Sequence, residues 1–306
     1  MKILITGGNG FIGSHFADRL IKNGDDVTLF DLEYTGNTGH MKCEKITGDI
    51  TNMKNISDAV KGKDFIFHFA AVSRVVWGQQ DPVKCINTNI IGTSNVLESV
   101  RNLNKNATVF LASSKEVYGN AQKMPVNETH PKNPISVYAA SKLAAERFCI
   151  AYQKTFGINC VITRFSSVYG SERDRLGRVV PTFMLNALKG KPLNISTSGH
   201  MLDFTFIDDV VQGMFKTYKA CGKKDISGED FHFATGKGTS LEELAGTVLK
   251  ICNSKSDVTV NDVSDYYSEG FVADLTKAKS LVGYEPKYKL CDGLKLLKTR
   301  LEENCL

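Results

Sequence analysis

The sequence of 306 residues lacks features that would each indicate a particular class of protein. No stretch approaches the roughly 20 apolar residues of a membrane span. The first residues enter an apolar run after one lysine, without the charged region and cleavage site of a signal peptide. The net charge is only +5, and Lys and Arg are scattered rather than clustered with aromatic residues as on nucleic-acid surfaces. We therefore expect a cytoplasmic protein that binds neither nucleic acid nor membranes.

Metal-ligand spacings are missing as well. The chain has eight cysteines but no C-x-x-C pair, which argues against a zinc site. Cys149 and Cys160 lie in apolar runs, as is typical of buried free thiols in a reducing compartment. We predict no metal site.

What the sequence does have is a regular alternation of short apolar runs with helix-period segments. Uninterrupted β-branched and aromatic runs indicate strands covered on both faces, as in a parallel sheet. The alternation predicts an α/β fold with a doubly wound (Rossmann) parallel sheet. The predicted strands are 2–7, 26–31, 45–49, 64–71, 108–114, 160–167 and 231–235, and the predicted helices include 14–23, 89–102 and 136–156.

The pattern changes after about residue 166, where Gly and Pro punctuate short segments. We expect residues 1–166 to form the Rossmann domain and residues 167–306 to form mainly a smaller, C-terminal substrate-binding lobe. The segment 203–235 is predicted to return to the main sheet.

The first predicted strand runs into TGGNGFIGSH, where Gly7, Gly10 and Gly13 are spaced G-x-x-G-x-x-G. Gly7 permits a tight turn, Gly10 lets the backbone approach a pyrophosphate, and Gly13 lets the helix pack on the strand. The amino terminus of that helix then faces the phosphates. Such a loop can be a simple turn, but here it follows a strand, opens a helix and begins the sheet. Together these contexts predict dinucleotide binding.

Asp31 ends the second predicted strand, 18 residues after Gly13. A carboxylate there can accept both hydroxyls of an adenosine ribose and would repel a 2′-phosphate. No Arg or Lys neighbours it in FDLEYTG, which favours NAD over NADP. The alternative is a helix cap or a loop aspartate. Asp49 and Ile50, at the end of the third strand, are candidates to hold the adenine.

Tyr138 and Lys142 lie four residues apart in a predicted helix and therefore share one face. A lysine ammonium beside a phenol lowers the tyrosine pKa toward neutrality, which makes the tyrosine a usable general base or acid. The spacing alone is common in exposed helical pairs. After a dinucleotide fingerprint, it predicts a catalytic pair.

These motifs resemble the extended short-chain dehydrogenase/reductase family, in its nucleotide-sugar epimerase/dehydratase branch. The same resemblance is carried by the stretches GDI, HFAA, NTNIIGT, SSKEVYG and RFSSVYG. The resemblance is dense over the first 170 residues and then thins to DFTFIDD and FVADLTKA. It implies NAD as cofactor, a nucleotide-sugar substrate that is most commonly UDP-linked, and a homodimer in which helices 89–102 and 136–156 form a four-helix bundle with those of the partner.

The resemblance also implies roles for single residues. Tyr138 resembles the catalytic base, Ser114 its hydroxyl partner, and Lys142 and Asn89 cofactor contacts. In such enzymes the tyrosine removes a proton from a sugar hydroxyl while hydride leaves the same carbon for NAD. The other candidate cofactor-binding residues are Phe11, Ile12, Phe69, Ala70, Ala71 and Phe165, and the candidate substrate-binding residues are Arg74, Ser167, Arg178, Val179 and Phe271.

The stretch Ser114-Lys115-Glu116 bears on the reaction. Dehydratases resemble Thr-Asp-Glu here, and a lysine cannot take the acid role of that Asp in the same geometry. Dehydration is therefore disfavoured. Decarboxylases resemble Thr-Ser-Glu, so Glu116, a candidate catalytic residue, leaves that reaction open, although YAASK is closer to epimerases. Glu116 could instead bond a sugar hydroxyl, or the Lys-Glu pair could have no chemical role.

The second half departs from the epimerase pattern. Leu202 replaces an arginine that contacts the substrate diphosphate, Ser167 replaces an asparagine, and a further arginine near Ser264 is missing. The alternatives that remain for holding the diphosphate are Arg173, Arg175, Arg178 and His200. Arg74 could reach a pyrophosphate or a sugar carboxylate, or be a surface residue. His68 is predicted to be a core histidine.

We predict an NAD-dependent UDP-sugar 4-epimerase. The alternatives are an enzyme like UDP-glucuronate decarboxylase and, from another class, a non-catalytic NAD-binding protein. The sequence leaves open whether the sugar is a hexose, an N-acetylhexosamine or a hexuronate. Phe271, three residues before Asp274, is expected to lie beside the sugar C2 group or, equally, in the core of the smaller lobe.

Overall fold

The computed structural model describes residues 1–174, 177–195, 199–261 and 268–305, so the candidate Arg175 lies outside the described residues. The chain divides into two compact units. Unit 1 comprises Met1–Gly119, Pro131–Phe165 and Met214–Phe231, and unit 2 comprises Asn120–His130, Ser166–Gly213 and His232–Leu306.

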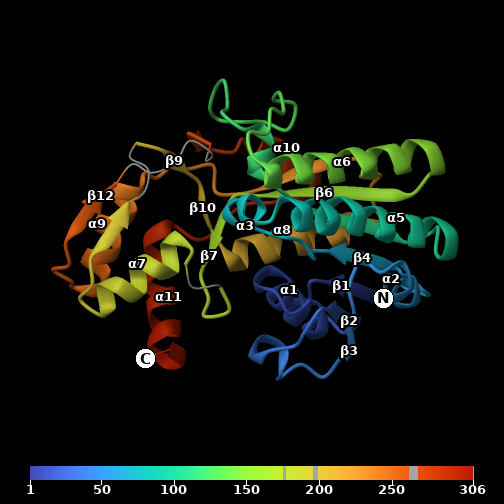
Figure 1. Ribbon diagram of the computed structural model, residues 1–306, viewed down its shortest axis with the longest axis horizontal. Coiled ribbons are helices and arrows are strands. Elements are labelled where there is room, and N and C mark those ends of the chain that lie inside the picture. The colour runs from blue at the N-terminus through green and yellow to red at the C-terminus, as the bar shows by residue number, and fades with distance from the viewer. Residues whose placement is uncertain (175–176, 196–198, 262–267, 306) are drawn as a thin grey trace. The chain divides into compact units, whose positions relative to one another are not determined.

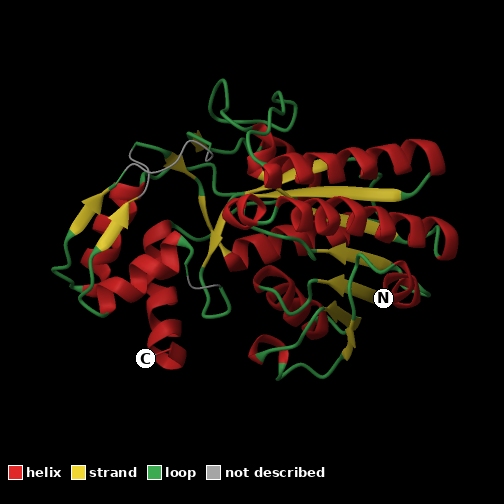
Figure 2. Cartoon of the chain, in the orientation of Figure 1, coloured by secondary structure: helices red, strands yellow, loops and turns green. Residues whose placement is uncertain are grey.

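Unit 1 is built around a seven-stranded sheet in the order β11-β6-β5-β4-β1-β2-β3, shown in yellow in Figure 2. The pairings from β6 to β3 are all parallel. The order reverses at β1, which has β2 on one side and β4 on the other. The strands are β1 (Lys2–Thr6), β2 (Asp26–Asp31), β3 (Glu44–Thr47), β4 (Phe65–His68), β5 (Thr108–Ser114), β6 (Asn159–Phe165) and β11 (Asp230–Phe233).

Helices cover both faces of this sheet, which explains the uninterrupted apolar runs of its strands. On one face, Ile66 and Val109 pack in a buried cluster with residues of α2, α5 and α6. On the other, the rings of Phe67 and Phe110 stack at 4.5 Å, and Phe16 of α1 packs against Phe67. The helices are α1 (Phe11–Lys22), α2 (Met53–Val60), α3 (Val75–Gln80), α4 (Pro82–Ile86), α5 (Gly92–Leu103) and α6 (Val137–Phe156). Helix α8 (Ile207–Ala220) begins in unit 2 and belongs to unit 1 from Met214. Helices α5 and α6 lie side by side (Figure 1).

The predicted doubly wound parallel sheet is confirmed, and the predicted strands 26–31 and 108–114 coincide with β2 and β5. Within the segment 203–235, residues Met214–Phe231 belong to unit 1, and β11 is a strand of the seven-stranded sheet. The predicted boundaries of the Rossmann domain and the smaller lobe stay a prediction. At the start of this segment, the buried carboxylate of Asp203 accepts the backbone N–H groups of Thr235 and Gly236 at 2.8 Å, within unit 2.

The described part of unit 2 contains short parallel strand pairs and further helices. The pairs are β7 (Ser167–Tyr169) with β10 (Phe204–Phe206), β8 (Leu193–Ile195) with β12 (Val258–Val260), and β9 (Met201–Leu202) with β13 (Gly270–Phe271). The helices are α7 (Val179–Leu188), α9 (Leu241–Cys252), α10 (Thr276–Val282) and α11 (Leu290–Cys305). None of the helices in the described parts of the chain is long and apolar enough to cross a membrane.

Candidate active site

The loop between β1 and α1 is shaped by its three glycines. Gly7 has a φ of +69°, and a Cβ there would lie 2.6 Å from the backbone nitrogen of Ala70. A Cβ on Gly13 would lie 2.3 Å from the carbonyl oxygen of Gly7, so only glycine lets α1 start so close to the strand. At Gly10, a Cβ would have one described neighbour, the Gly7 oxygen at 3.1 Å. The backbone at Gly10 is therefore open on that side.

This loop and the start of α1 form a cradle for an anion. Gly10 is the N-cap of α1, no side chain caps the helix, and Phe11 and Ile12 are its first residues. The first N–H groups of a helix are donors without intrahelical partners and carry partial positive charge. The cradle lies at the carboxyl end of β1, where the strand order reverses, which is where open α/β sheets bind nucleotides. These residues therefore fit the pyrophosphate of a dinucleotide.

Asp31, at the end of β2, is fixed beside the glycine loop. One carboxylate oxygen accepts the backbone N–H of Asn9 at 2.8 Å, and the other accepts that of Leu32 at 2.8 Å. Carboxylate oxygens accept more than one hydrogen bond, so this position is compatible with binding ribose hydroxyls. That role stays a prediction.

The other predicted cofactor residues also follow strands of the same sheet. After β3, Asp49 accepts the N–H of Thr51 at 2.8 Å, and Ile50 is buried against Gly92. After β4 come Phe69, Ala70 and Ala71, and the Phe69 ring stacks on that of Phe165, at the end of β6, with centroids 6.5 Å apart.

Asn89 lies in a π-helical turn (Asn87–Ile91) directly before α5. Its amide donates to the carbonyl of Val72 at 3.0 Å and accepts the N–H of Val72 at 2.8 Å, and it also donates to the hydroxyl of Ser141 at 2.8 Å. Asn89 therefore ties the loop after β4 to α6, next to Lys142. A direct contact of Asn89 with a cofactor stays a prediction. The sequence did not indicate that Ser141 binds Asn89.

Tyr138 and Lys142 lie in the first two turns of α6. The hydroxyl of Ser136 caps this helix by accepting the N–H of Ala139 at 3.2 Å, which sets where the helix begins. Both side chains are buried, and the Lys142 ammonium donates to the carbonyl of Ala112 in β5 at 2.9 Å. Burial lowers the pKa of Lys142 to about 8, against the opposing attraction of Cys85 and Glu146. A perturbed buried lysine next to a tyrosine is typical of an active site.

His68, inside β4, is the core histidine that the sequence predicted. Its two ring nitrogens bond the hydroxyls of Thr6 at 2.7 Å and Thr93 at 3.1 Å. Burial lowers its pKa to about 3, so the ring is neutral at pH 7.

Ser114 ends β5, and Lys115–Tyr118 form a 3-10 turn, η3. The Ser114 hydroxyl accepts the N–H of Glu116 at 3.2 Å. The Lys115 ammonium lies 2.6 Å from the Glu116 carboxylate, and the two side chains are only 9% and 12% exposed. This pair is therefore buried, unlike the solvated surface pairs that contribute little.

Arg74 and the predicted substrate residues near α7 are all held by neighbours. The Arg74 guanidinium lies over the ring of Trp77 at 5.3 Å. Ser167 opens β7 and donates its N–H to the Asp203 carbonyl at 3.1 Å. Arg178, followed by Val179 at the start of α7, donates to the carbonyl of Val168 at 3.1 Å. Arg178 is also 3.7 Å from the carboxylate of Asp174.

Phe271, in β13, is only 3% exposed, and its ring meets the His232 ring edge-on at 5.6 Å. It pairs with Leu202 of β9, the residue at the position of the missing arginine. Phe271 is therefore buried in unit 2, as the alternative of a core residue predicted. A position beside the sugar stays a prediction.

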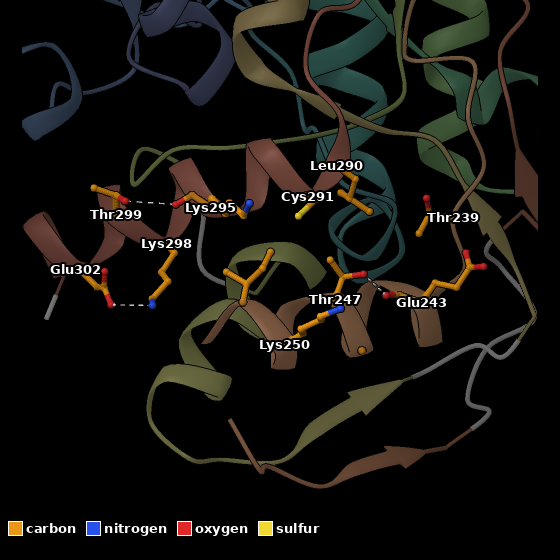
Figure 3. Close-up of a pocket in the computed structure, with 12 residues that line it drawn as sticks. Thr239, Glu243, Thr247, Lys250, Leu290, Cys291, Lys295, Lys298, Thr299 and Glu302 are labelled. Carbon is orange, nitrogen blue, oxygen red and sulfur yellow. Dashed lines mark hydrogen bonds and ion pairs between the residues drawn. The ribbon is translucent and has the colours of Figure 1, made fainter. Parts of the chain in front are cut away.

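A pocket of about 1030 Å³ lies within unit 2, mainly between α9 and α11 (Figure 3). It is lined by Thr239, Glu243, Gly246, Thr247, Lys250, Ile251, Leu290, Cys291, Lys295, Lys298, Thr299 and Glu302. None of these is among the predicted site residues, so the pocket is not the predicted active site.

The doubly wound sheet, the glycine cradle and the buried Tyr138 and Lys142 define a short-chain dehydrogenase/reductase of the extended, nucleotide-sugar type. Residues 4–297 match the model of the GDP-mannose 4,6 dehydratase family, and the chain belongs to this family. The resemblance found in the sequence is thereby confirmed.

Relatives of this chain are similar to it over almost its whole length. It is 32% identical to a Methanocaldococcus jannaschii protein with the provisional name UDP-glucose 4-epimerase, over 99% of each chain. It is also 32% identical to UDP-glucuronic acid decarboxylase 5 of Arabidopsis thaliana, over 97% of this chain and 88% of the relative.

A UDP-glucuronic acid 4-epimerase from Bacillus cereus, solved with UDP-glucuronic acid and NAD, is 30% identical over 99% of each chain, with a TM-score of 0.91. Other similar structures also hold NAD, which is the cofactor of this family. The relatives described above thus carry the names of UDP-sugar epimerases and of a UDP-sugar decarboxylase, and a dTDP-glucose 4,6-dehydratase from Streptomyces venezuelae is a further similar structure, with 28% identity and a TM-score of 0.91. The family therefore fixes the enzyme class more closely than the reaction.

Proposed function

We propose that this protein is an NAD-dependent 4-epimerase of a UDP-sugar. The observation that carries the proposal is the burial of Tyr138 and Lys142 on successive turns of α6. The Lys142 ammonium donates a hydrogen bond to Ala112 of β5, which lies two residues before Ser114. The glycine cradle at β1 and Asp31 at β2 would hold the NAD.

In the proposed reaction, Tyr138 removes the proton from the 4-hydroxyl of the sugar, and the hydroxyl of Ser114 donates a hydrogen bond to the same oxygen. The Lys142 ammonium favours the phenolate form of Tyr138. NAD, when bound, would supply the acceptor for the hydride from C4 and later its donor. Tyr138 then gives the proton back to the oxygen of the 4-keto sugar after the sugar has presented its other face.

The η3 turn supports epimerisation over dehydration. Lys115 stands where a dehydratase needs an acid, and its ammonium is already 2.6 Å from Glu116. A charged, paired lysine is a poor proton donor to a departing hydroxyl. We therefore propose that Glu116 stabilises this turn and accepts a hydrogen bond from a sugar hydroxyl, without taking part in an elimination.

The decisive experiment incubates the purified protein separately with UDP-glucose, UDP-GlcNAc and UDP-glucuronate and identifies each product by NMR. We expect inversion at C4 of one or more of these sugars, without added reductant and without net NADH, because each hydride is returned. One NADH formed per product would contradict epimerisation and indicate a dehydrogenase.

Decarboxylation is the second candidate, because Glu116 is present and decarboxylases are among the relatives with 32% identity. In the same assay, a decarboxylase would convert UDP-glucuronate to a UDP-pentose and carbon dioxide. A UDP-hexuronate product inverted at C4 with its carboxylate retained would exclude it.

We further propose a cytoplasmic homodimer formed through α5 and α6. Leu103 of α5 and Phe148 and Phe156 of α6 are large apolar side chains that are 46%, 38% and 37% exposed. Such neighbouring exposed apolar residues favour an interface. Light scattering tests this by comparing the molar mass of the parent with that of Phe148→Glu. We expect the parent to be a dimer and the variant a monomer, because the substitution places a charge in the apolar interface.

A further inference from the structure

Behind η3 lies a buried network of charged and hydroxyl groups centred on Arg164, in β6. In the sheet, Arg164 is the register partner of Ser113, the residue before Ser114. Its side chain and that of Glu146 are each only 1% exposed. Neither residue was singled out by the sequence reasoning, and the proposed reaction does not use them.

The Arg164 guanidinium binds three elements. It donates two hydrogen bonds to the Glu146 carboxylate, at 2.7 and 2.8 Å, in the bidentate geometry that makes such pairs strong and directional. A third goes to the hydroxyl of Tyr118 at 2.8 Å, and the Asp230 carboxylate of β11 lies 2.6 Å away. Burial opposes its charge, but the bonds to Glu146 keep the pKa of Arg164 above its usual value.

Two of the partners of Arg164, Glu146 and Tyr118, lie close in the chain to residues of the proposed chemistry. Glu146 lies one turn of α6 beyond Lys142, and it also accepts the Ser113 hydroxyl at 2.6 Å. Tyr118 ends η3, the turn that begins directly after Ser114. Helix α6 is therefore anchored to β5 at two successive turns, by Lys142 on Ala112 and by Glu146 on Ser113.

We infer that Arg164 and Glu146 are positioning residues, which hold η3 and the first turns of α6 in register so that Ser114, Tyr138 and Lys142 meet the sugar in one geometry. This role rests on the proposed function. A purely stabilising role explains the network less well, because buried ion pairs stabilise proteins little compared with well-packed apolar residues. Misplacement of reacting groups by about 1 Å, in contrast, can cost about 100-fold in rate.

The test compares four variants with the parent, all assayed well below their unfolding midpoints. Glu146→Gln keeps the shape but removes the charge, and Tyr118→Phe removes only the hydroxyl that Arg164 binds. The double variant Arg164→Met/Glu146→Leu replaces the pair with apolar side chains and guards against simple loss of folding. The control is Arg19→Met, because Arg19 is an exposed arginine of α1 that lies over the Phe215 ring.

We measure kcat and KM for the UDP-sugar, the unfolding midpoint, and hydrogen–deuterium exchange of the peptide that contains η3. For Glu146→Gln and Tyr118→Phe we expect kcat to fall by about 10- to 100-fold with KM within about threefold, and exchange at η3 to accelerate. In the double variant we expect the unfolding midpoint to return toward that of the parent, whereas kcat should stay as low as in Glu146→Gln. Arg19→Met should match the parent in all three.

Two outcomes would overturn the positioning role. One is recovery of kcat together with the unfolding midpoint in the double variant. The other is parent-like exchange at η3 in Glu146→Gln. If the parent itself inverts none of the three sugars, the proposed function fails separately, and the exchange at η3 still decides whether the network holds this turn.

Discussion

Unit 1 and unit 2 differ in the length of their strands and in the size of their sheets. The strands of the seven-stranded sheet are four to seven residues long, whereas the other strands among the described residues have two or three residues and form two-stranded sheets. Long buried strands leave continuous apolar runs in a sequence, and very short ones leave none. Unit 2 also has buried apolar residues on its helices, such as Leu244 and Leu297, and it adds polar contacts such as those of Asp203 with the backbone of Thr235 and Gly236. Its short strands are therefore harder to predict from sequence patterns than those of the main sheet.

The same contrast extends to function. Unit 1 carries the glycine cradle, Asp31, Tyr138 and Lys142 in the family's order. In unit 2, Leu202 and Ser167 stand at the two positions where the resemblance implies substrate-binding polar residues. We therefore expect changes in unit 1 to alter turnover equally for every sugar, and changes in unit 2 to alter the preference between sugars.

The largest effect is expected for Tyr138→Phe, which removes the proposed base while keeping the ring. We expect kcat to fall by about 10² to 10⁴ for each accepted sugar, the usual range for loss of a general base. Steady-state kinetics with all accepted substrates measure this, and Tyr152→Phe, farther along α6, is the control. Turnover within a few-fold of the parent would mean that another group is the base.

The cofactor preference should depend on Asp31. Because Asp31→Ala removes a charged acceptor of ribose hydroxyls, we expect NAD affinity to fall by about tenfold or more and the preference over NADP to narrow. Titration calorimetry with both cofactors measures this. Asp26→Ala, at the exposed start of the same strand, should leave both affinities unchanged. Equal affinities of the parent for NAD and NADP would contradict the role of Asp31.

The stability of unit 1 should depend on pH through His68. Its folded-state pKa of about 3 lies below the usual 6.5, so the unfolded chain binds a proton that the folded chain does not. The free energy of unfolding should therefore fall as pH drops from 6.5 toward 3, by about 1.4 kcal/mol per unit.

Urea unfolding at several pH values checks this prediction by comparing the parent with His68→Gln, which does not titrate. The slopes of the unfolding free energy against pH should differ between the two proteins by the equivalent of about one proton. Parallel slopes for the parent and His68→Gln would mean that the buried ring is protonated in the folded state.

The sequence predicted most of unit 1 because its signals are local. The glycine spacing, the alternation of runs and the Tyr138–Lys142 interval each lie within one or two elements. It did not predict the Asn89–Val72–Ser141 bonds or the Arg164 network, because these join residues that are distant in the chain. The contact of the Asp203 carboxylate with Thr235 was likewise not predicted, because it joins residues 32 positions apart.

The smallest effect, and the sharpest test of the comparison, concerns Phe271 in unit 2. If this ring lies beside the sugar C2 group, it crowds an N-acetyl substituent. Phe271→Ser should then raise kcat/KM for UDP-GlcNAc relative to UDP-glucose by several-fold, the scale on which pocket size discriminates substrates. If Phe271 is only a core residue packed on His232, the substitution should lower stability by about 3–5 kcal/mol, as for other large-to-small core changes, and leave the ratio unchanged. Phe271→Leu, which keeps an apolar side chain of intermediate size, is the control for stability. A parent that already prefers UDP-GlcNAc would exclude the crowding role while leaving the epimerase proposal intact.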